Sequence, residues 1–184
     1  KRITAVISEN NTTNYTVYRD DTSSDSTAAN DNAPFWPGYS AGNQSNTFTV
    51  GELGLEAKPN DTVEYTIYFL NQGNAPASNI KICDRLSQYL DYSPDAYGSS
   101  MGIKLNFNNS ETNLTGVADV DAGQFFGPDL TPSGCIRPDN LQPMTAADNP
   151  NGTLRVELAN VDPATSPATP ANSYGYIRFR ARVK

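Results

Sequence analysis

The chain contains no histidine among its 184 residues and only two cysteines. Histidine is the usual general base beside a serine or cysteine nucleophile, so such nucleophile pairs are excluded. A zinc site is excluded as well, because it needs more His or Cys ligands than the chain holds. Carboxylates, lysines and tyrosines remain as acids or bases, yet no two acidic residues stand at a spacing that predicts a glycosidase pair. We therefore expect a protein that is not an enzyme.

Basic residues are scarce too, with 13 Lys and Arg against 20 Asp and Glu, which gives a net charge of −7. Nucleic acid binds to basic surfaces, so it is not an expected partner. No apolar run approaches the roughly 18 residues that predict a membrane span. No signal peptide is present, so a secreted protein would be represented here by its mature form or by an excised segment.

Hydrophobic residues make up only 37% of the chain. Asn, Thr, Ser, Asp, Gly and Pro fill the difference, which is typical of short strands joined by many polar loops. Ten Tyr and seven Phe are too many aromatic residues for a chain that is disordered throughout. The length suits one domain, which we assign to residues 1–184.

The clearest element is a strand over residues 62–69, where Val63, Tyr65, Ile67 and Phe69 alternate with more polar residues. This period of two is typical of a half-buried strand. Residues 71–76 then supply turn chemistry through Gly, Asn and Pro, and a second alternating run follows. Further strands are predicted over residues 2–7, 15–18, 46–50, 53–57, 79–84, 101–107, 123–127, 153–159 and 175–184.

Two long loops are expected, over about 19–45 and 108–150, together with an extended, solvated linker over 162–171. No segment predicts a helix convincingly. Many short strands at irregular spacing, with strands near both ends, favour an all-β fold. We expect an immunoglobulin-like Greek-key β-sandwich that carries long loops.

Cys83 and Cys135 can form one disulfide, and the alternative is a pair of free, buried thiols. A polar, acidic, loop-rich chain suits an oxidising compartment, which favours the disulfide. Such a bridge would close a loop of about 50 residues and restrict the unfolded chain by about 4 kcal/mol. Cys83 alternates with Ile80 and Ile82, so we expect the bridge outside the main core, where it pins the 108–150 excursion to the sandwich.

The segment 58–86 carries a resemblance. Residues 58–67 have the pattern Lys-Pro-Asn-Asp-Thr-Val-Glu-Tyr-Thr-Ile, and the turn at 71–80 and Asp84-Arg85-Leu86 follow it. This resembles the prokaryotic conserved-repeat family called domain of unknown function 11, and the two ends of the chain resemble a secreted cyanobacterial branch of it. The resemblance implies a sandwich in a secreted or cell-surface protein without known catalysis. Asn60 replaces the usual Gly, Cys83 is unusual, and no Pro follows Leu86.

Calcium is the cofactor that the sequence favours most. Asp119 and Asp121 stand two residues apart before Gly123, an arrangement in which carboxylate oxygens can converge on a hard cation. The acidic block 20–31 is a second candidate. The alternative for both is a polar loop without a metal, and the bidentate Glu that completes an EF-hand loop is missing from the first.

Two further groups are candidate ligand or partner sites. Phe35, Trp36 and Tyr39 could stack on sugar rings, or they could cap one end of the core. The other group is a basic row in the last strand, which could meet an acidic partner or polysaccharide, or guard an edge strand against uncontrolled pairing. The row consists of Arg178, Arg180, Arg182 and Lys184.

We therefore expect a non-catalytic structural module of an extracellular, cell-surface or filament-forming protein. Its partners would be other copies of itself or surface polymers. The N-terminal strand, with Ile3, Ala5 and Ile7 at alternate positions, could complete the sheet of the next copy. The alternative is an adhesion module that binds carbohydrate or calcium through the aromatic and acidic loops.

Overall fold

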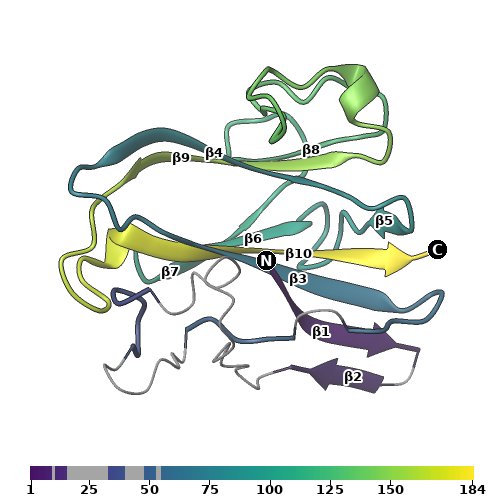
Figure 1. Ribbon diagram of the computed structural model, residues 1–184. Coiled ribbons are helices and arrows are strands. Elements are labelled where there is room, and N and C mark those ends of the chain that lie inside the picture. Colours follow the sequence, from purple (N-terminus) through teal and green to yellow (C-terminus); the bar gives the residue numbers. More distant parts are fainter. Residues whose placement is uncertain (10, 16–32, 40–47, 53–54) are drawn as a thin grey trace.

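The computed structural model describes residues 1–9, 11–15, 33–39, 48–52 and 55–184. Two antiparallel sheets pack face to face, so the expected fold class is confirmed as an all-β sandwich (Figure 1). The strands are β1 Arg2–Ser8, β2 Asn11–Asn14, β3 Thr62–Leu70, β4 Ala77–Arg85, β5 Leu90–Tyr92, β6 Ile103–Phe107, β7 Ser110–Leu114, β8 Gly123–Phe126, β9 Thr153–Val161 and β10 Tyr174–Val183. Two short 3₁₀ helices, η2 Ala146–Asp148 and η3 Ala171–Ser173, complete the described elements.

The large sheet has the strand order β2-β1-β3-β10-β6-β7, and β5 also pairs with β10. Its centre is the β3–β10 pair, which stays in register from Tyr174 opposite Leu70 to Arg182 opposite Thr62. Both strands have apolar residues at every second position, so one face of the pair can be buried along its whole length. Strand β10 has a neighbouring strand on each side, β3 and β6, so it lies in the middle of the sheet and not at an edge.

The small sheet has the order β4-β9-β8. The chain reaches it from β3 through the turn at 71–76, and Asn71 holds this turn by its side chain. The Asn71 Nδ2 donates to the carbonyls of Ala75 at 3.0 Å and Val161 at 2.8 Å, and its Oδ1 accepts from the Gly73 N–H at 2.9 Å. One amide side chain thus fixes the crossing between the two sheets.

The main core lies between the sheets and draws on both of them. Its buried residues are Ile103, Leu114, Leu154, Val156, Leu158, Val161, Ile177 and Phe179. Each such side chain contributes about 1.5–3 kcal/mol when it leaves water. A smaller cluster of Leu86, Leu90 and Ala181 extends the buried layer toward one end of the sandwich.

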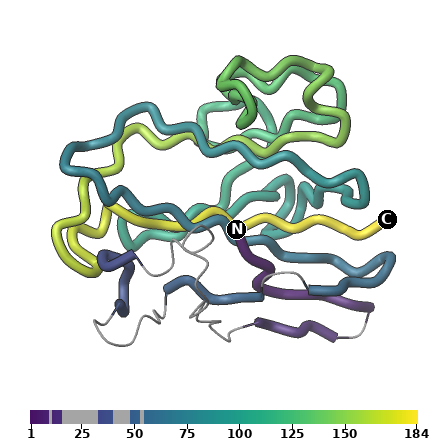
Figure 2. The backbone as a smooth tube through the Cα atoms, viewed as in Figure 1, coloured from purple at the N-terminus to yellow at the C-terminus, as the bar shows by residue number. Residues whose placement is uncertain are grey.

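The disulfide is confirmed, with the Cys83 and Cys135 Cα atoms 5.9 Å apart. Cys83 is on β4 and does not belong to either buried cluster, so the bridge lies outside the main core as expected. It ties the excursion after β8 to the small sheet, and Figure 2 shows this excursion as a green lobe above that sheet.

Several predicted elements differ from the structure. Residues 48–50 and 55–57 are not strands, the second strand is Asn11–Asn14 and not 15–18, and positions 16–18, 46–47 and 53–54 lie outside the described residues. Strands β5 and β7 were not predicted, because three residues are too few for a pattern and β7 is polar on both faces.

The segment 162–171 was predicted to be extended and solvated. Residues 165–169 are exposed as predicted, but the segment is neither extended throughout nor free of contacts. Ala164 is buried, and its N–H donates to the Asn71 carbonyl at 2.9 Å. The Thr165 N–H donates to the carbonyl of Thr169 at 2.8 Å, so the segment turns back on itself. It closes one end of the sandwich beside the β3–β4 turn.

Candidate functional site

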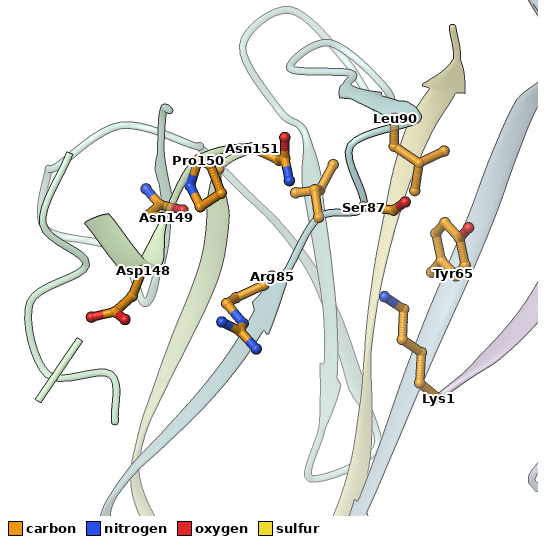
Figure 3. Close-up of a pocket in the computed structure, with 11 residues that line it drawn as sticks. Lys1, Tyr65, Arg85, Ser87, Leu90, Asp148, Asn149, Pro150 and Asn151 are labelled. Carbon is orange, nitrogen blue, oxygen red and sulfur yellow. The ribbon is translucent and has the colours of Figure 1, made fainter. Parts of the chain in front are cut away.

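A pocket of about 350 Å³ opens at one end of the sandwich (Figure 3). Four separate stretches of chain build it: the N-terminus, the middle of β3, the β4–β5 connection and the loop before β9. The smaller apolar cluster supplies Leu86 and Leu90 to its lining. The lining residues are Lys1, Tyr65, Arg85, Leu86, Ser87, Leu90, Asp148, Asn149, Pro150, Asn151 and Gly152.

Lys1 forms an ion pair with Asp84, with its Nζ 2.5 Å from the Asp84 Oδ2. The same ammonium lies 4.4 Å from the centroid of the Tyr65 ring, within the range of a cation–π contact. Burial raises the pKa of Tyr65, and the charge of Asp84 adds to the shift. Tyr65 therefore stays protonated at neutral pH, and the charge of Lys1 is balanced by its neighbour.

Arg85 differs from Lys1, because no hydrogen bond or ion pair joins its guanidinium to another described residue. It acts electrostatically on Asp148, whose pKa is held below its usual value. The main causes of that shift are hydrogen bonds from the backbone N–H and hydroxyl of Thr145, and the charges of Arg137 and Arg85 contribute less. Figure 3 shows Arg85 between Asp148 and Lys1.

The loop before β9 is held rigidly by Asn149, which is only 1% exposed. Its Nδ2 donates to the carbonyls of Gly127 at 2.8 Å and Leu130 at 2.9 Å. Its Oδ1 accepts from the Thr153 hydroxyl at 2.7 Å. Asn149 thus ties together the two ends of the disulfide-bound excursion, and it places one wall of the pocket.

The predicted basic row is divided by its contacts. Glu64 is buried, with 6% of its surface exposed. Its Oε2 forms an ion pair with Arg180 Nε at 2.9 Å, and its Oε1 lies 3.4 Å from Arg178 Nε. Arg182 is 58% exposed and lies 3.7 Å from Asp91. The edge-guard interpretation is wrong, because β10 lies between β3 and β6. A role in partner binding stays a prediction, and Arg182 is the member of the row with the most exposed side chain.

Glu64 is the organising residue of the outer face of the large sheet. The Thr4 hydroxyl donates to its Oε1 at 3.0 Å, and the Tyr97 hydroxyl donates to its Oε2 at 3.1 Å. Burial raises the pKa of Tyr97, and the charge of Glu64 raises it further. From the sequence alone Glu64 could be placed only on the polar face of a strand, since its partners come from three distant segments.

The aromatic group does not form an exposed platform at Trp36, which is 3% exposed. Trp36 stacks on Phe48 at 5.7 Å and meets the edge of Tyr68 at 6.5 Å. Phe35 and Tyr39 are half-buried. The group covers the outer face of the large sheet, which is closer to the capping interpretation than to a sugar-stacking surface.

The carboxylates of Asp119 and Asp121 are engaged within their own loop. Asp121 accepts from the backbone N–H groups of Thr115 at 2.7 Å and Gly123 at 2.7 Å. Asp119 accepts from the Thr115 hydroxyl at 2.6 Å and the Asp121 N–H at 2.9 Å. In the described part of the chain no three His, Cys, Asp or Glu side chains form a group suited to a metal ion. The second calcium candidate, 20–31, lies outside the described residues.

The predicted assembly strand is β1, which lies between β2 and β3 in its own sheet. Ala5 is 2% exposed, while Ile3 and Ile7 are half-buried. Ile7 is registered opposite Thr62. The strand is therefore an integral part of the large sheet within one chain.

Comparison with known proteins adds one finding. Residues 43–115 match a domain of unknown function, DUF7619. The DUF7619 match spans β3 to β7, so it includes Glu64 and Arg85 but neither Lys1 nor the loop before β9. Searches of curated proteins and of solved structures give no match. Among the described helices none is long and apolar enough to cross a membrane.

Proposed function

We propose that this chain is a non-catalytic structural module of an extracellular or cell-surface protein. The observation that carries the proposal is the Cys83–Cys135 disulfide, because such bridges form and persist in oxidising compartments. The resemblance of segment 58–86 to the conserved-repeat family supports the same location. Asn60, which stands where that family usually has Gly, has a left-handed backbone with φ of 72°, as a Gly position would favour.

The internal use of charge also supports a structural role. Arg178 and Arg180 are paired with Glu64, and Lys104 is paired with Glu111 at 2.7 Å. These pairs hold neighbouring strands of the large sheet together, as a scaffold requires. The alternative is an adhesion module that binds carbohydrate or calcium. Two observations count against it: Trp36 is buried, and the Asp119 and Asp121 carboxylates are hydrogen-bonded within their own loop.

Self-assembly would proceed by exchange of β1 between copies. Strand β1 pairs with β2 and β3 of its own chain. After exchange it would make the same contacts with β2 and β3 of the next chain, so the number of favourable contacts would stay almost the same. An open series of such exchanges would give a filament.

The double variant Ile7→Cys with Thr62→Cys tests this exchange, because the two positions face each other in the β1–β3 ladder. If β1 is exchanged, oxidation links different chains, and a non-reducing gel shows a ladder of covalent oligomers. Ile7→Cys alone is the control and can give dimers at most. An intrachain link in a protein that stays monomeric by light scattering would refute exchange of the N-terminal strand.

A further inference from the structure

The guanidinium of Arg85 is an exposed charge that lines the pocket. Most other described arginines have an acidic partner within 4 Å, namely Arg137, Arg155, Arg178, Arg180 and Arg182. Arg85 has no such partner there, although it lines a pocket. A guanidinium presents five N–H donors in a planar fork that matches a carboxylate, so these donors are available to a ligand.

The charge balance around the pocket favours an anion. Lys1 is matched by Asp84 at 2.5 Å, and Asp148 faces Arg137 at 3.6 Å. Once these two pairs are set aside, Arg85 leaves one positive charge at the pocket. This local excess is notable in a chain whose net charge is −7.

The remaining lining suits a small polar ring. Leu86 and Leu90 give an apolar surface, while Ser87 and Asn151 carry hydroxyl and amide groups that can bond to hydroxyls. The volume of about 350 Å³ falls at the lower end of the range of small-molecule sites, about 300–1,000 Å³. A ligand of one ring fits this space better than a long chain does.

We propose that this pocket binds a carboxylated sugar, a single uronic acid unit, through a bidentate contact between its carboxylate and Arg85. The ring packs on Leu86 and Leu90, and Ser87 and Asn151 bond to its hydroxyls. The inference goes beyond a structural role, since it gives the module a ligand of its own.

The wild-type protein provides the first test, by titration at low salt with glucuronate, glucose and acetate, followed by ¹H–¹⁵N NMR. We expect glucuronate to shift the amide signals of Ser87, Asn151 and Gly152, and we expect added salt to weaken the effect. Glucose and acetate should bind at least about tenfold more weakly, because each lacks one half of the contacts.

The variant Arg85→Gln should weaken glucuronate binding at least about tenfold, since it removes the charged fork. Lys81→Gln is the matched control: it removes an exposed cation from the same strand but outside the pocket lining, and it should bind as the wild type does.

Three results would overturn the inference. Glucuronate that leaves the pocket amides unshifted rules out the site. Acetate or glucose that binds as tightly as glucuronate rules out a carboxylated sugar as the specific ligand. Equal affinity in wild type and a folded Arg85→Gln variant rules out the role of Arg85. None of these results bears on strand exchange, which the cysteine cross-link tests separately.

Discussion

Glu64 is a single carboxylate that joins four segments of the chain. It contacts Thr4 of β1, Tyr97 of the loop after β5, and Arg178 and Arg180 of β10. A buried carboxylate is costly unless its charge and its lone pairs are satisfied, and here both are. Glu64 therefore ties strand β1 to strand β10, so that each helps to hold the other in place.

Replacement of Glu64 by Gln should lower the free energy of unfolding by about 2 kcal/mol, as measured by urea denaturation. The change leaves two arginines without their counter-charge, and their partial exposure keeps the loss below that of a fully buried pair. Glu157→Gln is the control, since Glu157 is 44% exposed in its pair with Arg155 and should cost less than about 1 kcal/mol. Equal losses for the two variants would contradict this account.

Strands and their connections show which information the sequence carries locally. Strands β3, β9 and β10 were predicted because their apolar residues alternate and one face of each is buried. Strand β7 has four exposed polar residues in succession, so only its pairing with β6 makes it a strand. Backbone hydrogen bonds to a neighbouring strand do not depend on side-chain type, so the composition of a polar edge strand does not reveal them.

The candidate site was less predictable than the fold for a similar reason. The disulfide could be predicted because the chain has two cysteines and one pairing. The pocket brings together Lys1, Tyr65, Arg85 and the 148–152 loop, which are far apart in the sequence and share no motif. Likewise, the burial of Trp36 depends on Tyr68 of β3 and on Phe48, neither of which is adjacent in sequence.

At the scale of elements, removal of the disulfide should loosen the excursion more than the sandwich. The double variant Cys83→Ala with Cys135→Ala should lose about 4 kcal/mol of stability, because the bridge closes a span of 52 residues. Hydrogen exchange at the centre of β3 and β10 should become faster in line with this global loss, and residues 128–148 should become faster still, because they also open locally. Equal acceleration in residues 128–148 and in the two sheets would contradict a local role for the bridge in the excursion.

Across the whole molecule, several tyrosines resist ionisation. Burial raises the pKa of Tyr176 to about 12, helped by its hydrogen bond to Glu111, and burial likewise raises the pKa of Tyr68 and Tyr97. In the unfolded chain these groups ionise near pH 10. Between about pH 10 and 12 the folded state therefore holds more protons than the unfolded state, so stability falls as the pH rises.

This pH dependence predicts a lower urea midpoint at pH 11 than at pH 8. The absorbance of tyrosinate near 295 nm should rise together with the loss of the folded circular dichroism signal, because the buried hydroxyls ionise only on unfolding. A full rise in tyrosinate absorbance while the protein remains folded would show that the tyrosines are accessible, and would contradict the prediction.

The central position of β10 has a consequence for the order in which the protein can form. Strand β10 separates the β1–β3 half of the large sheet from the β6–β7 hairpin, and it follows the other described strands of that sheet in the sequence. Until residues 174–183 are available, the two halves have no shared strand, and Glu64 has neither arginine partner. A nascent chain that stops before Tyr174 thus has the hairpins but not the sheet, and the large sheet must close after synthesis of its last strand.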